Sequence, residues 1–405
     1  MPWKETDVRS ERIRFVVEAV QGEETMRSLC GRYGISRKTG YKWLRRWEEV
    51  GSLGELDEHS RRPHRSPRQT DSAIEDRVVR LRQQYGWGSR KLRCLLQREG
   101  IELGRATIHR ILVRRGLIGE STRSRPAVQR FERSAPNELV QMDFKGPYTL
   151  RRGRVCLPLS LLDDHSRFAV ALAPLATNHT ARVQRVLEKS FERYGVPESM
   201  LVDHGTPWWS STNGHGLTRL GVFLIRQGVR LVYSGIGHPQ TQGKVERFHQ
   251  TLAAWLEHHG TPETHRGFQA ALASFRQEYN QVRPHEALDL ETPSQRYRPS
   301  TRRYRPNPAP WQYPEGAEVR RLAGNGCFHE KGRYHFVCLA LEGRRVRLER
   351  FGDRILISYR HMLIRELNTT TGMTRSILKP YGPTGQKDGG GPTVLRTSGP
   401  PPSDC

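Results

Sequence analysis

The chain has 405 residues, so at about 150 residues per domain it should hold two or three domains. Its 67 Lys and Arg against 42 Asp and Glu give a formal net charge of +25, which favours an extended polyanion as partner. The longest uncharged apolar run, Val155 to Leu162, is far shorter than the roughly 18 residues of a membrane helix, which excludes a helical membrane protein. The first 20 residues lack a secretory pattern, so a cytoplasmic protein is expected.

The charge is unevenly distributed along the chain. Residues 1–135 carry a net charge of +12, residues 136–299 only +4, and residues 300–405 carry +9. Two basic flanks predict that nucleic acid is held at both ends, while the nearly neutral centre keeps acids for chemistry. The six cysteines form no C-x-x-C pair, which indicates reduced thiols rather than a disulfide frame or zinc knuckle.

The first 50 residues predict three helices. Apolar spacing marks helices over residues 13–20 and 26–33, and Ser36 is a good N-cap for a third. A basic outer arc on the third helix favours a helix-turn-helix that enters the major groove of DNA, with an ordinary solvated helix as the alternative. The expected DNA-binding residues on this arc are Lys38, Lys42, Arg45 and Arg46.

A second helical pattern follows a basic, Pro-containing linker at residues 53–70. Three apolar stretches between residues 74 and 112, broken by glycines, predict a second helix-turn-helix at residues 71–120. Its last helix would present Arg110 and Arg114 to DNA. Residues 121–135 are again polar and Arg-rich, which predicts a connector.

After Pro136 the pattern changes to short β-type runs. The expected order is βββαβαβα with one more helix, and the first three strands should form a meander. The strands are expected at Leu139–Phe144, Val155–Leu162, Arg167–Leu172, Met200–Val202 and Arg230–Tyr233, and the helices at Thr180–Tyr194, near Thr218–Gln227 and from Lys244 onward.

Three acids in this region are poorly explained by stability. Asp143 lies inside a strand, where a buried carboxylate is costly unless it is paired or bound to a metal ion. Asp203 ends an apolar strand and opens a loop, and Glu246 lies at the edge of the apolar stripe of its helix. Each alone has an ordinary explanation, as a cap, a turn residue or a solvated glutamate. Together they predict a metal site.

The segments that carry these acids resemble a known family. They are QMDFKG at Asp143, LVDHGTPW at Asp203 and GHPQTQGKVERFHQTL at Glu246, followed by YNQVRPHEAL at Tyr279–Leu288. They look like the integrase-type core of bacterial insertion-sequence transposases, which has an RNase H-like α/β fold and an Asp, Asp, Glu triad. The resemblance covers about Pro136 to Arg298 and extends to the upstream helix-turn-helix modules.

The resemblance implies a DNA transposase. Asp143, Asp203 and Glu246 would be both the catalytic and the metal-binding residues, holding two Mg²⁺ ions for which Mn²⁺ could substitute. The enzyme would bind the terminal inverted repeats of a mobile element, cut the 3′ ends and join them to target DNA. Lys244 and Arg247 would contact phosphate. Double-stranded DNA is the expected partner, and a homo-oligomer on DNA, associated with the nucleoid, is expected because two ends must be handled together.

Other classes of function stay open at this point. His204 stands where many relatives have Asn, and Ala253 stands where many have Lys or Arg, so a catalytically inactive DNA-binding regulator is the alternative. A structure-selective nuclease of the same fold would cut without joining.

Asp163 and Asp164 read as a turn, and the histidines lack the spacing of a zinc site. Trp208 and its neighbours would either stack on unpaired bases or pack over the core.

The C-terminal part predicts a small all-β domain. Short alternating runs between residues 319 and 359 suit a small SH3-like β-barrel, and the Gly- and Pro-rich end suits a disordered tail. The expected organisation is a helix-turn-helix domain at 1–52, a linker at 53–70, a second helix-turn-helix domain at 71–120, a linker at 121–135, the RNase H-like core at 136–299, a linker at 300–314, the β-barrel at 315–367 and the tail at 368–405.

Overall fold

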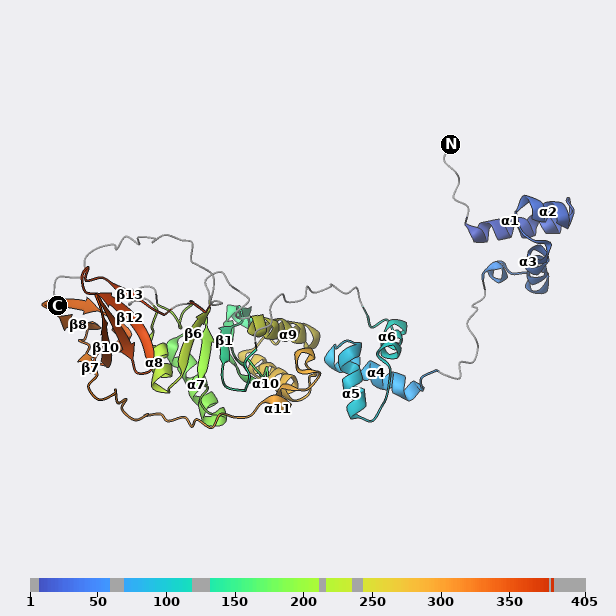
Figure 1. Cartoon of the computed structure of the whole chain (residues 1–405). Coiled ribbons are helices and arrows are strands. Elements are labelled where there is room, and N and C mark those ends of the chain that lie inside the picture. Colours follow the sequence, from blue (N-terminus) through green and yellow to red (C-terminus); the bar gives the residue numbers. More distant parts are fainter. Residues whose placement is uncertain are drawn as a thin grey trace. The chain divides into compact units, whose positions relative to one another are not determined.

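The computed structural model describes residues 7–58, 69–118, 132–210, 216–234, 243–378 and 380–381 (Figure 1). They divide into two compact units, Met1–Asp71 and Ser72–Cys405. Within the described ranges, no helix is both long and apolar enough to cross a bilayer.

The first unit is the predicted three-helix module. Ser36 caps the third helix, with its hydroxyl accepting a hydrogen bond from Thr39 N at 3.2 Å. Leu56 is fully buried in the core of this unit, so the start of the predicted linker belongs to the module, while residues 59–68 lie outside the described residues. The elements are α1 (Val8–Gln21), α2 (Met26–Arg32), α3 (Arg37–Val50) and the 3₁₀ helix η1 (Leu53–Leu56).

Gly40 explains how α3 approaches the other two helices. A Cβ atom at this position would lie 2.6 Å from Cys30 Sγ and 2.9 Å from Phe15 Cζ. Glycine inside a helix costs about 1 kcal/mol of propensity, and here that cost permits close packing of the helices.

We predict that Gly40→Ala destabilises the first unit by about 1–3 kcal/mol, because the added methyl group overpacks the core. Hydrogen exchange of residues 7–58 in the full chain should show faster exchange in α1–α3. Gly31→Ala is the matched control, since nothing lies within 4 Å of a Cβ at that position in α2. Equal protection of the Gly40→Ala and Gly31→Ala variants would contradict the packing explanation.

The second unit begins with the other predicted helical module. Its helices surround a core that includes Leu81, Leu92, Ile108 and Leu112. The connector expected at residues 121–135 lies largely outside the described residues. The helices are α4 (Ser72–Tyr85), α5 (Ser89–Arg98) and α6 (Arg105–Arg114).

A mixed sheet follows, and its main strands lie at or near the predicted positions, while one further short strand, Tyr148–Thr149, was not predicted. β1 and β3 are antiparallel, β3 and β4 are antiparallel, and the parallel strands β5 and β6 continue the sheet beyond β1, so the expected meander is confirmed. The strands are β1 (Val140–Phe144), β2 (Tyr148–Thr149), β3 (Val155–Asp163), β4 (Ala169–Leu175), β5 (Ser199–Val202) and β6 (Arg230–Ser234).

Helices cover both faces of this sheet (Figure 1). Because side chains alternate along a strand, Leu159 and Leu161 of β3 pack with α7 and α8, while Cys156 and Leu162 pack with α9 and α10. The same alternation in β1 sends Met142 toward the first pair of helices. The helices are α7 (Thr180–Tyr194), α8 (Arg219–Arg226), α9 (Gly243–His259), α10 (His265–Gln281) and the short α11 (Pro293–Arg296).

The predicted C-terminal β-barrel is not confirmed. Strands β7 and β13 form the two edges of an open five-stranded sheet in the order β13-β12-β11-β10-β7, and β8 and β9 form a separate hairpin. The strands are β7 (Glu318–Arg321), β8 (Cys327–Glu330), β9 (Arg333–Phe336), β10 (Arg345–Phe351), β11 (Arg354–Tyr359), β12 (Met362–Asn368) and β13 (Thr374–Ser376).

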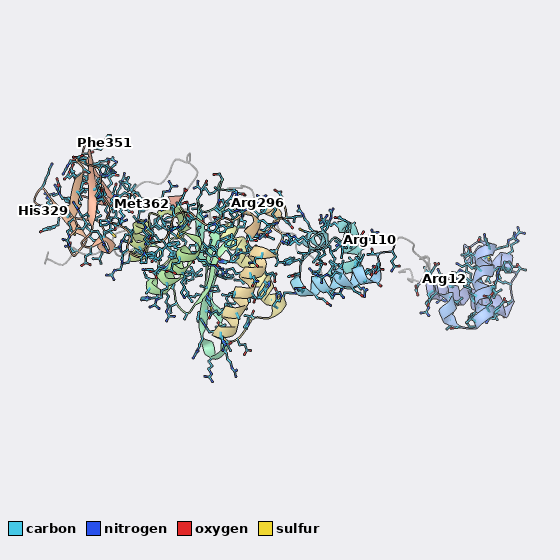
Figure 2. The ribbon with its side chains drawn as sticks, turned by 90° about the horizontal axis from the view of Figure 1, so that it is seen from below. Arg12, Arg110, Arg296, His329, Phe351 and Met362 are labelled. Carbon is cyan, nitrogen blue, oxygen red and sulfur yellow. The ribbon has the colours of Figure 1, made fainter. Side chains whose placement is uncertain are left out.

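The C-terminal sheet packs on the core. Leu231 N of β6 lies 3.3 Å from Met362 Sδ, and Figure 2 shows Met362 where the two parts meet.

Part of the predicted tail is strand: β13 pairs with β12, and β14 (Pro380–Tyr381) pairs in parallel with β6. Residues 382–405 lie outside the described residues. In the predicted linker at 300–314, Arg302 donates hydrogen bonds to the carbonyl oxygens of Pro197 and Gly228, so this segment lies against the core.

Candidate active site

Asp143 lies near the end of β1, opposite Ser160 of β3. Strand alternation points it to the face covered by α9, where its carboxylate lies 3.7 Å from His249 Nδ1 and its side chain is 21% exposed. His249 Nε2 in turn lies 2.9 Å from Ser160 Oγ, and burial lowers the pKa of His249 to about 4, so the ring is neutral at neutral pH. A neutral imidazole therefore lies between Asp143 and the neighbouring strand.

Asp203 comes directly after β5, the strand that pairs in parallel with β1. The parallel register pairs Val140 with Met200 and Gln141 with Leu201, so its continuation brings Asp143 level with Asp203. Gly205 N donates a hydrogen bond to Asp203 Oδ1 at 2.9 Å, which turns the chain away from the sheet.

Glu246 lies in the first turn of α9, where it is exposed. Two contacts hold this turn against the sheet: Val245 N donates to Gln141 Oε1 at 3.2 Å, and Lys244 Nζ lies 2.6 Å from Asp164 Oδ2. Gln141 also donates to Asp164 Oδ1 at 2.9 Å, so β1 and α9 meet through one buried carboxylate. We call Gln141, Asp164 and Lys244 the clamp.

The pKa of Asp143 responds to the charges of both other acids. Burial, followed by the negative charges of Asp203 and Glu246, raises the pKa of Asp143 to about 7, against the opposing effects of the Phe144 N–H and Lys145. Both predicted partners thus act on Asp143. Among the described residues, however, no three His, Cys, Asp or Glu side chains are arranged closely enough to hold a metal ion.

The carboxylates nevertheless fit a divalent ion by their chemistry. Hard cations prefer oxygen ligands, and a cation would relieve the repulsion that raises the pKa of Asp143. The segment 235–242, which leads into α9, lies outside the described residues.

The structure places the predicted DNA-binding residues in different environments. In the first module, Lys38, Lys42 and Arg45 are exposed on α3 and Arg46 is half-buried. Lys42 and Arg46 both lie over the Trp43 ring, at 4.3 and 4.9 Å from its centroid. These contacts leave the predicted basic arc on the outer face of α3.

The predicted contacts of the second module and of α9 also differ in exposure. Arg110 (Figure 2) and Arg114 are both exposed on α6, but Arg114 forms an ion pair with the buried Glu75. Arg247 is exposed on α9, but Lys244 is engaged in the clamp. Arg114 and Lys244 therefore have intramolecular partners that the sequence pattern did not indicate.

The remaining sequence questions concern the loop after Asp203. Trp208 is buried and stacks on Phe144 with the ring centroids 5.6 Å apart, so it packs in the core rather than offering a stacking face. His204 packs edge-on against Trp209 at 4.6 Å, and burial lowers its pKa. Asp163 accepts hydrogen bonds from Asn137 N and Ser166 N, as a turn residue does.

Sequence reasoning missed the clamp and His249. Asp164 stands in what reads as a turn, yet its side chain is completely buried and accepts hydrogen bonds from Arg133 N and Gln141. The signal in the sequence was a polar residue, Gln141, two positions before Asp143 on the same face of a strand.

Comparisons with known proteins agree with this layout. Family models match residues 227–293 as an integrase core domain, residues 39–112 as a homeodomain-like domain and residues 11–64 as a helix-turn-helix domain. An uncharacterized 31.7 kDa protein of insertion element IS407 from Burkholderia multivorans is 28% identical over 238 residues, 56% of this chain and 82% of that protein. The chain resembles insertion-sequence transposases with an integrase-type core.

Two further similarities are weaker. The transposase for transposon Tn552 from Staphylococcus aureus is 24% identical over 272 residues, and the match spans 60% of this chain and 55% of that protein. The other is the catalytic core domain of HTLV-2 integrase, solved in complex with magnesium. The match spans 40% of this chain and 97% of the integrase chain at 14% identity, with a TM-score of 0.32. A likeness at that TM-score adds nothing to the interpretation of the integrase-type core.

The raised pKa of Asp143 predicts a pH-dependent cost to stability. Its folded-state pKa of about 7 exceeds the ordinary value of 3.8, so the site stabilises the fold fully below pH 4 and loses this contribution as the pH rises through 7. Relative to the intact chain, Asp143→Asn should therefore gain about 2–4 kcal/mol between pH 4 and 8.

Urea unfolding in EDTA from pH 4 to 8 measures this difference. Asp289→Asn is the control, since that side chain is 91% exposed and Asn also suits the positive φ of this position. A constant difference between the Asp143→Asn variant and the intact chain across this range would contradict the assignment.

The ion pair in the clamp predicts that the single variant Lys244→Met loses more stability than the double variant that also removes the charge of Asp164. Lys244→Met removes the cationic partner of the buried Asp164 and should lower the free energy of unfolding by about 3–5 kcal/mol. Adding Asp164→Asn should recover much of that loss, because it removes the buried charge. Lys189→Met, at an exposed position on α7, is the control. Additive losses in the double variant, measured by urea unfolding, would argue against the pairing.

Proposed function

We propose that this protein is a metal-dependent DNA transposase that binds the terminal inverted repeats of a mobile element, cleaves the 3′ ends and joins them to target DNA. The observation that carries this proposal is the register that brings Asp143 level with Asp203, together with the pKa of Asp143, which burial raises first and the charges of Asp203 and Glu246 raise further. The integrase core match, the helix-turn-helix matches and the similarity to a transposase support a polynucleotidyl transferase rather than a binding protein alone.

Asp143, Asp203 and Glu246 would hold the divalent ions, two Mg²⁺ in our proposal, with Mn²⁺ able to substitute. When bound, such ions lower the pKa of an attacking oxygen and stabilise the leaving oxygen of an in-line displacement. The exposed carboxylate of Glu246 would complete the ligand set from α9, and the clamp fixes the turn that carries it.

The chain itself would position the DNA and set the state of the carboxylates. Lys145 lies close enough to Asp143 to lower its pKa, and Arg247 offers a cation next to Glu246 for a flanking phosphate. His249 lies 3.7 Å from the Asp143 carboxylate and is a neutral ring at neutral pH. Water as nucleophile would cut the element end, and the 3′-hydroxyl so produced would attack the target strand, exchanging one phosphodiester bond for another.

The partners follow from the same proposal. The exposed Lys38, Lys42 and Arg45 of α3 and Arg110 of α6 would contact the terminal repeats. Because strand transfer handles two element ends together, we propose a homo-oligomer on DNA. The catalytically inactive regulator is not favoured by the comparisons.

Strand transfer with the element's own labelled terminal duplex and a supercoiled target, in Mg²⁺ or Mn²⁺, tests this function. Asp143→Asn, Asp203→Asn and Glu246→Gln should each lower the rate of joining about 10³-fold or more, because each removes a metal ligand. Asp289→Asn, which removes an exposed carboxylate, should leave the rate unchanged.

Each outcome selects one class of function. Joining that is lost in all three variants, with end binding retained, supports the transposase. Binding by the intact chain without cutting or joining favours the regulator, and cutting without joining favours a nuclease. Cleavage that survives all three substitutions would show that the active site lies elsewhere.

A further inference from the structure

The second helix-turn-helix module is fixed to the core by several contacts. His258 Nε2 of α9 lies 2.7 Å from the carbonyl oxygen of Gln83 at the end of α4. On α5, Arg98 donates to the carbonyl oxygen of Val282 at 3.0 Å, just beyond α10. Arg98 is the last residue of α5, and Arg90 in its first turn lies 3.7 Å from Glu286, so α5 runs beside the segment that follows α10.

Cations gather at this contact, where the charges of Arg283, Arg247 and Arg90 act on Lys91. Arg90 and Lys91 come from the first turn of α5, Arg283 comes from the segment after α10, and Arg247 comes from α9. We call these four residues the junction. Two acids lie nearby among the described residues. Glu286 lies 3.7 Å from Arg90 with both side chains about half exposed, and the negative charge of Glu278 acts on Arg283.

The two inner cations lack an acidic partner. Within the described parts of the chain, no carboxylate lies within 4.0 Å of Lys91 or Arg283, and the guanidinium of Arg283 lies over the Trp87 ring at 5.4 Å. Next to them, His285 Nε2 is buried without a hydrogen-bond partner among the described residues.

Their charges are held at a cost to the fold. Burial and then the charge of Arg283, with smaller contributions from Arg247 and Arg90, lower the pKa of Lys91 to about 8, and only Glu286 opposes this. Burial also lowers the pKa of Arg283 and, to about 3, the pKa of His285. Cations that outnumber the acids around them would be stabilised by a bound anion.

We propose that the junction binds backbone phosphates of duplex DNA that runs from the second helix-turn-helix module toward the carboxylates. The four cations come from three elements that are fixed to one another, which suits the regular row of charges on a duplex. Arg247 follows Glu246 directly, so a phosphate held there is carried next to the acids. Lys244 was expected to contact phosphate but is paired with Asp164 in the clamp, so the junction would supply that phosphate contact instead. This inference rests on the proposed function for the direction of the DNA.

Lys91→Met in the full chain tests the junction. Binding of the labelled terminal duplex is followed by fluorescence anisotropy in EDTA at several salt concentrations. Lys91→Met should raise Kd and lower the slope of log K against log salt by about 0.9, the loss of one phosphate contact. Lys91→Arg should keep the slope, and Lys189→Met on α7 should change neither quantity.

A melting curve of each variant separates binding from folding. Because the folded chain disfavours the charge on Lys91, Lys91→Met should keep or raise the melting temperature while it weakens DNA binding. A structural lysine would behave in the opposite way, with a lower melting temperature and unchanged affinity for the duplex.

Unchanged affinity and salt slope in Lys91→Met would overturn the inference, as would a loss of affinity that follows a lower melting temperature and is shared by Lys91→Arg. These readouts need no catalysis, so the two proposals can fail separately. A chain that cuts nothing but shows the reduced slope in Lys91→Met would keep the junction and lose the transposase. A chain that cuts and joins with an unchanged slope would do the reverse.

Discussion

The position of Glu246 depends on one buried carboxylate. Asp164 accepts a hydrogen bond from Gln141 of β1 and pairs with Lys244 of α9, so the strand and the helix are joined beneath the surface. Asp143 follows Gln141 by two residues and Glu246 follows Lys244 by two, so both acids take their place from this contact. The candidate active site therefore depends on an ion pair that does not belong to the triad, and that would cost much to break because it is buried.

Two groups of like charges each have a member at the start of α9, Glu246 in one and Arg247 in the other. Burial and then the charges of Asp203 and Glu246 raise the pKa of Asp143, while burial and then the charges of Arg283 and Arg247 lower the pKa of Lys91. Proteins accept such losses of stability at functional sites, where a ligand of opposite charge compensates for them. A divalent cation and a DNA phosphate are the ligands that these two groups require in our account, and Glu246 and Arg247 are adjacent in the chain.

Much of the core could be predicted because alternation and helical spacing are local signals. The run at Leu139–Phe144 became β1, the helix predicted at Thr180–Tyr194 is α7, and the parallel register of β1 and β5 sets Asp143 and Asp203 side by side. Contacts between distant segments could not be predicted in this way. Asp164 reads as a turn residue because its partners lie 23 and 80 positions away, and the open C-terminal sheet differs from a barrel only in whether its edges pair.

The most direct test of the central claim is the position of bound Mn²⁺, located by anomalous scattering in crystals of the intact chain grown with its terminal duplex. If the three acids form one metal site, manganese lies within about 2.2 Å of carboxylate oxygens of Asp143 and Asp203, with Glu246 as a further ligand. Manganese bound elsewhere, with Asp143 left in contact only with His249, would contradict the assignment of these three acids to one metal site.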